Sequence, residues 1–258
     1  MSHKIALIGA GNVAYSLAPA IAAAPGFGLV QIVARTASSA QALAADIPGC
    51  SGDTVDRLTD SADIYILAVT DTALTRLAAE LTPRPEAFWF HTSGSVPAVV
   101  LARLSPHYGV VYPLQTFTRG RRLDMRRVPI FIEGSDSEAT EMALKLANAI
   151  SDTVHPADSA ARKRMHIAAV FGCNFVTHML DIADRQLRAD GLDISVLQPL
   201  IDETMRKCAE IGPHSAQTGP ARRGDSGIIR AHEEMLSEEL RPLYHLISQS
   251  IMKEYEQN

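Results

Sequence analysis

The sequence predicts an α/β protein, in which a doubly wound, mostly parallel sheet is followed by an all-helical C-terminal region. Two observations carry this prediction. Short apolar runs typical of buried strands alternate with helical segments up to about residue 155, and only helical patterns follow His155-Pro156. We therefore expect two domains, at residues 1–155 and 156–258, and 258 residues suffice to give each a core.

The composition excludes several classes of protein. With 24 basic and 29 acidic residues the net charge is −5, which argues against nucleic-acid binding because phosphate backbones require a basic surplus. Cys50, Cys173 and Cys208 lie far apart, in no short-spaced pair that would bind zinc or form a redox motif. We predict no metal site and a reducing, cytoplasmic compartment.

No charged residue occurs between Lys4 and Arg35, so this stretch must be weighed as an export signal or a membrane span. Glycine and proline interrupt it repeatedly, whereas a spanning helix would be continuously apolar. We expect neither membrane insertion nor secretion. The stretch instead predicts a strand at 4–9, a helix at 12–24 and a second strand at 29–35, which together form a βαβ unit.

The turn between that first strand and helix is Gly9-Ala10-Gly11-Asn12-Val13-Ala14, a G-x-G-x-x-A pattern. Gly9 permits a tight turn, Gly11 lets the backbone approach a pyrophosphate, and Ala14 keeps the helix close to the sheet. The start of the helix offers free N–H groups to the anion. Because the pattern stands in the required strand-to-helix context, it predicts a dinucleotide site in a Rossmann-type domain.

The second strand indicates which dinucleotide is bound. An NAD site expects an acidic residue at its end to hold the ribose 2′-hydroxyl. Here the strand ends in Arg35-Thr36, followed by Ser38 and Ser39. A cation and hydroxyls at a helix start suit a 2′-phosphate, so we predict NADP as the cofactor.

Further strands are predicted at 63–70, 87–90, 109–117 and 128–133, with helices at 71–81 and 137–150. Ligands of such sheets bind at the carboxyl ends of the strands, so polar residues there are candidates for the site: Thr70, Asp71, His91, Ser93 and Gln115. For Asp71, a helix N-cap is an equally good interpretation. His91 lies in a polar turn where a nicotinamide would bind.

An arginine-rich segment follows, with Arg119, Arg121, Arg122, Arg126 and Arg127. A solvated loop is the commoner explanation of such a segment. The alternative is a clamp for the cofactor phosphate or an acidic substrate.

The helical half begins with a segment from Asp158 or Ser159 to Gly191, about 45–50 Å long if continuous. Such a helix either bridges domains or packs against a second subunit. Along it, His166, Val170, Asn174 and His178 advance four residues at a time, and they are either packed polar groups or the lining of a cleft. Further helices are predicted at 195–211, 226–236 and 237–256.

Between the helices predicted at 195–211 and 226–236 lies TGPARRGD, residues 218–225. The two glycines and the proline indicate an unusual backbone, and the paired arginines beside an aspartate form a charge cluster. We predict a substrate or cofactor clamp that includes Thr218, Arg222, Arg223 and Asp225. The alternative is a rigid loop in which Asp225 or Ser226 caps the next helix.

Five motifs in this order, GAGNVA, AVTD, HTSGS, YPLQTF and TGPARRGD, carry a resemblance that spans nearly the whole chain. The chain resembles bacterial proteins with a Rossmann-like N-terminal domain and a helical C-terminal domain of unknown function, described as NADP oxidoreductases of the deazaflavin-dependent type. These are similar to the 6-phosphogluconate dehydrogenase-like superfamily, which includes pyrroline-5-carboxylate reductase and β-hydroxyacid dehydrogenases.

The resemblance implies a homodimer formed through the C-terminal helices and a cleft between the domains lined by His91, Gln115, Asn174 and Arg223. It also implies cofactor contacts at Gly9, Gly11, Asn12, Val13, Arg35, Thr36, Ala68, Val69 and Thr70. The β-hydroxyacid dehydrogenases carry a catalytic lysine four residues before an asparagine of the long helix. Val170 occupies that place before Asn174, so their mechanism does not transfer.

We therefore predict an NADP-dependent oxidoreductase that transfers a hydride to or from a small anionic carbonyl or imine substrate. His91 and Asn174 are the candidate catalytic residues together with Arg223, which would hold the anionic group. Ser93 is a further candidate for the cofactor, and Gln115 for the substrate. Two alternatives stay open: a non-catalytic NADP sensor or assembly subunit, and hydride exchange with a deazaflavin.

Overall fold

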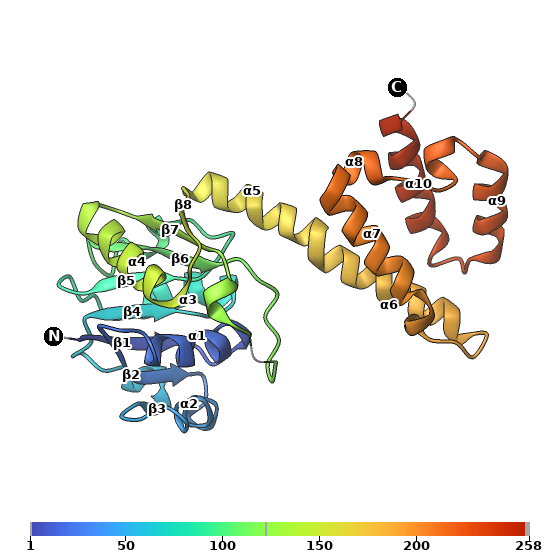
Figure 1. Ribbon diagram of the computed structural model, residues 1–258. Helices are drawn as coiled ribbons and strands as arrows, with labels where there is room; N and C mark the ends of the chain where they lie inside the picture. Colours follow the sequence, from blue (N-terminus) through green and yellow to red (C-terminus); the bar gives the residue numbers. More distant parts are fainter. Residues whose placement is uncertain (1, 122, 256–258) are drawn as a thin grey trace. The chain divides into compact units, whose positions relative to one another are not determined.

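The computed structural model describes residues 2–121 and 123–255 (Figure 1). The chain divides into two compact units, residues 1–178 and 179–258. The last strand of the sheet ends at Pro156, and the helix that follows it begins within the first unit. A domain boundary at residues 155–156 stays a prediction.

Within the described residues, the first unit contains one eight-stranded sheet of order β3-β2-β1-β4-β5-β6-β7-β8 (Figure 1). All neighbouring strands are parallel except β6 and β7, which confirms the predicted mostly parallel sheet. The strands are β1 (His3–Ile8), β2 (Phe27–Ala34), β3 (Ser51–Thr54), β4 (Ile64–Leu67), β5 (Phe88–His91), β6 (Tyr108–Pro113), β7 (Ile130–Gly134) and β8 (Val154–Pro156).

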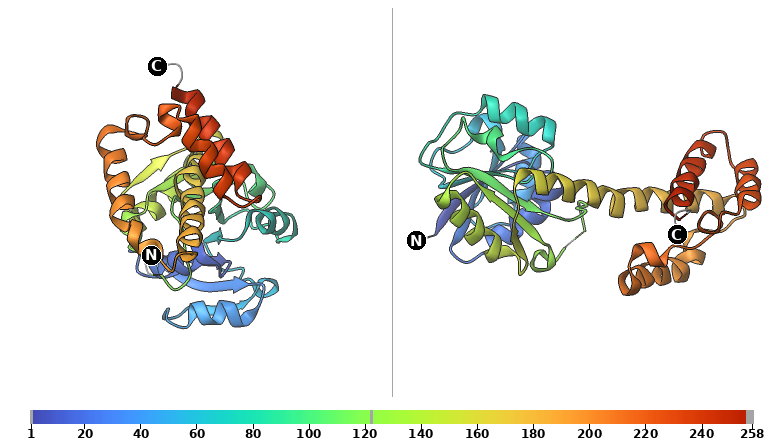
Figure 2. Two further views of the ribbon diagram at one scale, coloured as in Figure 1. Left: turned by 90° about the vertical axis from the view of Figure 1, so that its right-hand side faces the viewer. Right: turned by 90° about the horizontal axis from the view of Figure 1, so that it is seen from above.

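Helices cover both faces of this sheet. Alternate residues of β1 point to opposite sides, so Ile5 and Leu7 pack in one apolar cluster while Ala6 and Ile8 pack in another. The first cluster includes residues of α1 (Asn12–Ala22), α2 (Ala37–Ala44) and α4 (Ser137–Ile150), and the second includes residues of α3 (Asp71–Glu80). Figure 2 shows α3 and α4 on opposite faces. The predicted doubly wound arrangement is therefore confirmed, and it explains the uncharged stretch, since β1, α1 and β2 all contribute to the core.

Several predicted boundaries differ from the structure. The strand predicted at 109–117 ends at Pro113, and residues 114–117 leave the sheet as a loop. A further helix is also typical of the segment between the strands at 87–90 and 109–117, and the structure forms a 3₁₀ turn there, η2 (Ala98–Leu101). Neither β3 nor β8 is predicted from the sequence, because strands of four and three residues are too short to show an apolar period.

The long predicted helix forms as α5 (Ser159–Ala169), the π-helical segment η4 (Val170–Phe175) and α6 (Val176–Arg188). The Asp158 carboxylate caps its start by accepting the Ala161 N–H at 2.7 Å. At its end Gly191 has φ +73°, and the Leu192 N–H reaches the Leu187 carbonyl, which completes a Schellman motif.

A π-helical segment interrupts this helix at residues 170–175, where the backbone hydrogen bonds run from i to i+5. A four-residue step is close to one full turn in an α-helix and in a π-helix alike. The predicted alignment of His166, Val170, Asn174 and His178 along one face therefore stays a prediction.

The second unit consists of helices among the described residues. Besides most of α6 it contains α7 (Gln198–Ile211), α8 (Pro213–Ala216), α9 (Ser226–Met235) and α10 (Arg241–Tyr255) (Figure 2). The last of these begins later than the predicted residue 237, with Pro242 in its first turn, where proline is tolerated.

One helical run, Ser159–Arg188, is long and apolar enough to cross a membrane, with a mean hydropathy of 1.2 in its most apolar window. This is weak evidence for a span, because a helix of a soluble protein can meet the same criterion.

Candidate cofactor and active site

The turn after β1 requires glycine at its first position. Gly9 has φ +125°, and a Cβ at this residue would lie 2.2 Å from the carbonyl oxygen of Ala68. The Gly9 N–H donates to the Val33 carbonyl at 2.7 Å, so the turn is held between β2 and the end of β4. This packing brings the predicted cofactor residues Gly9, Ala68 and Val69 together at one edge of the sheet.

The second glycine faces open space. Gly11 is exposed, and no atom lies within 4 Å of the position a Cβ would take. Among the described residues, no side chain caps the start of α1, and its first turn contains no acidic residue. The N–H groups at Asn12 and Val13 therefore face an anion-binding position, as a dinucleotide pyrophosphate requires.

The end of β2 provides a cation and three hydroxyl groups. Arg35 is exposed, and Thr36 is the N-cap residue of α2, whose first turn contains no acidic residue. The Thr36 hydroxyl donates to the Ser39 hydroxyl at 2.8 Å, and the Ser38 hydroxyl lies 3.4 Å from that of Thr36. This cluster suits a phosphate. It contains no carboxylate of the kind that binds the free ribose diol of NAD.

At the ends of β4 and β5, a hydroxyl and a carboxylate are paired. The Ser93 hydroxyl donates to Asp71 at 2.7 Å and accepts the N–H groups of Ser95 and Val96 at 3.1 and 3.0 Å. Thr70, not Asp71, caps α3, with its hydroxyl accepting the Ala73 N–H at 3.4 Å. The N-cap interpretation of Asp71 is therefore wrong, because its carboxylate binds the turn after β5 instead.

His91 is buried at the end of β5, with an exposed fraction of 0%. Its Nδ1 accepts the Ser93 N–H at 3.1 Å, and within the described residues Nε2 has no hydrogen-bond partner. Burial, reinforced by the nearby charge of Arg162, lowers the pKa of His91 from 6.5 to about 3. The imidazole is thus neutral near pH 7 and screened from solvent, and its predicted role as a proton donor or acceptor stays a prediction.

This burial predicts a pH-dependent stability. Because the pKa of His91 is about 3 in the folded state and 6.5 when unfolded, the unfolded state takes up the proton first as the pH falls. The stability present above pH 6.5 should decline progressively toward pH 3. We expect His91→Asn, which retains an acceptor for the Ser93 N–H, to lose about 2 kcal/mol less than the wild type between pH 7 and pH 5. Urea unfolding at both pH values measures this, and an identical loss in both proteins would contradict it.

A buried arginine on α5 connects this helix to the turn after β5 and to β7. The Arg162 side chain on α5 is 1% exposed and forms an ion pair with Glu133. Its Nε donates to the Ser93 carbonyl at 3.1 Å and its Nη2 to the Val96 carbonyl at 2.7 Å. Arg162 is not predicted from the sequence, because the ARKR segment at 161–164 resembles the solvated start of a surface helix.

Beside the same turn, the Tyr112 hydroxyl and His166 Nδ1 are hydrogen-bonded at 3.1 Å. Tyr112 is the next-to-last residue of β6 and is buried, whereas His166 on α5 is half-buried. Gly94 packs directly on this pair, since a Cβ there would lie 2.7 Å from Tyr112 Cζ and 2.8 Å from His166 Nδ1. Burial raises the pKa of Tyr112; the Asp71 charge acts in the same direction and the Arg162 charge opposes it.

Two other predicted residues of the first unit are exposed. Gln115 lies in the loop after β6, where its Oε1 accepts the Thr116 N–H at 2.8 Å. Asn174 lies in the π-helical segment. Their predicted roles with a substrate stay predictions.

The TGPARRGD segment is an ordered loop of the second unit. Gly219 and Gly224 have φ +100° and +68°, and the Asp225 carboxylate caps α9 by accepting the Ile228 N–H at 3.2 Å. The Arg222 guanidinium lies 4.2 Å from the centre of the Tyr255 ring. These contacts correspond to the rigid-loop alternative. A clamp role for Thr218, Arg222, Arg223 and Asp225 stays a prediction.

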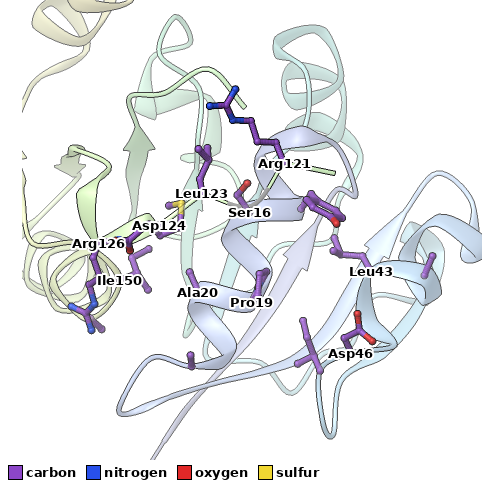
Figure 3. Close-up of a pocket in the computed structure, with 16 residues that line it drawn as sticks. Ser16, Pro19, Ala20, Leu43, Asp46, Arg121, Leu123, Asp124, Arg126 and Ile150 are labelled. Atoms are coloured by element: carbon purple, nitrogen blue, oxygen red, sulfur yellow. Dashed lines mark hydrogen bonds between the residues drawn. The ribbon is translucent and has the colours of Figure 1, made fainter. Parts of the chain in front are cut away.

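The arginine-rich segment borders a pocket of about 540 Å³ (Figure 3). Figure 3 shows Ser16, Pro19 and Ala20 of α1 between Leu43 of α2 and Ile150 of α4, with Arg121 at the rim. None of the predicted cofactor residues lines it. Arg126 pairs with Asp152 at 3.4 Å, and Arg122 lies outside the described residues.

In residues 2–121 and 123–255, no group of three or more His, Cys, Asp or Glu side chains is placed to hold a metal ion.

Comparisons with known proteins agree with this architecture. The family model described as "NADP oxidoreductase coenzyme F420-dependent" matches residues 4–87, and the "Domain of unknown function (DUF2520)" matches residues 128–251. A solved structure described as a "putative NADP oxidoreductase" from Bacteroides fragilis is 41% identical, with a TM-score of 0.90 and 98% of each chain covered. Curated proteins yielded no match.

Two more distant structures share the fold. A reductive aminase from Aspergillus terreus, in complex with NADPH and ethyl levulinate, is 14% identical with a TM-score of 0.70, over 98% of this chain and 95% of its own. A 1-pyrroline-5-carboxylate reductase from Streptococcus pyogenes is 12% identical with a TM-score of 0.64, over 98% and 99%.

The resemblance stated from the motifs is therefore confirmed. Given 41% identity over nearly the full length of both chains and the two family matches, this protein belongs to the NADP oxidoreductases that join an N-terminal domain of the F420-dependent type to a C-terminal DUF2520 domain.

Proposed function

We propose that this protein is an NADP-dependent oxidoreductase that transfers a hydride to or from a small anionic carbonyl or imine substrate. The observation that carries the proposal is the pairing of the glycine turn and open start of α1 with Arg35 and Thr36 at the end of β2. The first feature fits a pyrophosphate and the second a 2′-phosphate. A bound dihydronicotinamide would supply the hydride.

The substrate class rests on the relatives. The Aspergillus reductive aminase binds NADPH and the keto ester ethyl levulinate, and the Streptococcus protein is a pyrroline-carboxylate reductase. Their shared fold also supports membership in the 6-phosphogluconate dehydrogenase-like superfamily. The anionic character is proposed because Arg222 and Arg223 are exposed in the TGPARRGD loop.

Replacing Arg35 tests the choice of cofactor. We expect Arg35→Ala to weaken NADPH binding by about 10- to 100-fold, the value of one lost charge-assisted contact to a phosphate. Binding of NADH, which lacks the 2′-phosphate, should change less than about threefold. Isothermal titration calorimetry of both nucleotides measures this. Equal losses for the two would show that Arg35 does not read the 2′-phosphate.

Turnover separates an enzyme from a non-catalytic NADP sensor. After titration of NADPH, NADH and NADP⁺, oxo acids and imines are screened for loss of nicotinamide absorbance. We expect oxidation of NADPH by at least one of these compounds. Tight NADPH binding without turnover on any of them would favour the sensor.

Coenzyme F420, a deazaflavin, is a second candidate hydride partner, because the family model matched at residues 4–87 is described as F420-dependent. Mixing the protein with NADP⁺ and reduced F420 tests this. Oxidation of the deazaflavin would establish the exchange, and its absence would leave NADPH and a carbonyl or imine as the reacting pair.

We further propose a homodimer formed through the C-terminal helices. Large apolar side chains are exposed on several helices of the second unit, among them Leu200, Met205, Met235 and Leu246. Apolar surface of this kind commonly marks an interface. A dimeric mass in sedimentation equilibrium would support the proposal and a monomeric mass would contradict it.

We place such an enzyme in the cytoplasm, in keeping with the widely separated cysteines; extraction with the soluble fraction of cells tests this.

A further inference from the structure

We propose that His166 is the proton-exchanging residue of this site and that Tyr112 positions it. This inference rests on the proposed oxidoreductase function. Proton exchange, the role predicted from the sequence for His91, is thereby assigned to His166 on α5, with Tyr112 on β6 beside it.

His166 differs from its neighbouring ring side chains in its exposure to solvent. Three ring side chains lie near the turn after β5, and they differ in burial. His91 is 0% exposed and Tyr112 is 7% exposed, whereas His166 is half-buried. Of these three side chains, His166 is therefore the most exposed and the most accessible to a small molecule.

The ring of His166 is also held by a hydrogen bond at Nδ1. One nitrogen of His166 is engaged by the Tyr112 hydroxyl at 3.1 Å, and the two rings meet edge to face at 65°. A hydrogen bond at one ring nitrogen selects the tautomer and fixes the orientation of the ring. When the hydroxyl accepts from Nδ1–H, the neutral imidazole carries its free lone pair on Nε2. In this tautomer Nε2 is the nitrogen left for a ligand.

Tyr112 and His166 also lie at the edge of the sheet where a ligand is expected to bind. Tyr112 and Gly94 lie just at or beyond the carboxyl ends of β6 and β5, the edge at which the glycine turn after β1 also stands. Ligands of doubly wound sheets bind along this edge. Gly94 packs so closely that any side chain there would collide with Tyr112 or His166, so the backbone of the turn packs directly against both rings.

The charged groups around the pair come from three elements. Arg162 and the exposed Lys163 and Arg164 lie on α5, and Glu133 on β7 neutralises Arg162 by an ion pair. Asp71 on α3 is the acidic group nearest the turn, bound by the Ser93 hydroxyl. Burial raises the pKa of Tyr112, so the phenol stays protonated near neutral pH and acts as a hydrogen-bond partner instead of a phenolate.

The proton step follows from this arrangement. As a hydride reaches the carbonyl or imine carbon, the π electron pair moves to the oxygen or nitrogen. The Nε2–H bond of the His166 imidazolium breaks, and a new O–H or N–H bond forms on the substrate. The neutral imidazole that is left keeps Nδ1–H on the Tyr112 hydroxyl, and Nε2 takes up another proton from solvent. In the oxidative direction the same Nε2 accepts the proton.

The experiment combines a structural and a kinetic readout. Nitrogen-15 NMR of the full-length protein with saturating NADPH gives the tautomer of His166 without any substrate. We expect Nδ1–H in the wild type and its loss in Tyr112→Phe. An Nε2–H tautomer in the wild type, or an unchanged Nδ1–H tautomer in Tyr112→Phe, would overturn the positioning role.

With a substrate from the screen, His166→Gln should lower turnover about 100-fold or more while its NADPH affinity changes less than about threefold. Tyr112→Phe should shift the pH profile of kcat, and the exposed His155→Gln serves as the matched control. Full turnover in His166→Gln would overturn the catalytic role. A wild type that neither binds NADPH nor turns over any compound would refute the proposed function instead, and the same tautomer measurement, repeated without NADPH, would still test the pair.

Discussion

Replacing Gly9 by alanine is expected to destabilise the first unit by about 3 kcal/mol or more and to abolish measurable NADPH binding. The residue has φ +125°, which alanine rarely adopts, and the new Cβ would lie 2.2 Å from the Ala68 carbonyl oxygen. Since that oxygen belongs to the backbone beside β4, no side-chain rotation can relieve the overlap. Either the turn or β4 must shift, and both hold predicted cofactor contacts. Urea unfolding and calorimetry with NADPH measure the two effects.

Gly11→Ala is the matched control, because the space around Gly11 is open and its φ is −83°. We expect the free energy of unfolding to change by less than about 1 kcal/mol, the scale of a helix N-cap substitution. NADPH should still bind at least about tenfold more weakly, because the methyl group occupies the approach of the pyrophosphate. If Gly9→Ala were as stable as Gly11→Ala, the close contact with Ala68 would not be a constraint in solution.

Replacing Arg162 by methionine is expected to cost about 3 kcal/mol, because it removes one partner of a largely buried ion pair together with two hydrogen-bond donors. The guanidinium is 1% exposed and is bound by the Glu133 carboxylate and by the carbonyls of Ser93 and Val96. Its loss leaves the two carbonyls without this donor and leaves Glu133 with the Ser159 hydroxyl at 2.9 Å, and it removes these bonds between α5 and the turn after β5. Urea unfolding at pH 7 measures the change.

The exposed pair of Arg76 and Glu80 on α3 provides the comparison, since these side chains are 63% and 56% exposed at 3.2 Å. Arg76→Met should change the free energy of unfolding by less than about 1 kcal/mol, because solvent screens such a pair. A loss in Arg162→Met no larger than in Arg76→Met would mean that the buried network does not hold the turn.

Local patterns were sufficient for much of the architecture. The apolar runs of β1, β2 and β4 mark buried parallel strands because both of their faces lie under helices. The glycines at 9 and 11 mark the cofactor turn, because the backbone geometry that requires their spacing is formed within six residues. Asp158 and Gly191 mark the ends of the long helix for the same reason, since caps act on the nearest turn.

The chemistry at the other strand ends depends on contacts between distant residues. Asp71 and Ser93 are 22 residues apart in sequence, Tyr112 and His166 are 54 apart, and Arg162 and Ser93 are 69 apart. Nothing local distinguishes Arg162 from the exposed Lys163, or the buried His91 from the half-buried His166.

The sequence by itself therefore determined the fold class, the glycine turn and the cation at the end of β2, because each follows from the period or spacing of neighbouring residues. Only the tertiary structure decided which histidine is buried, which is half-exposed and which arginine is enclosed. Burial and charge pairing set the protonation of these groups, and both arise when the sheet and α5 pack together.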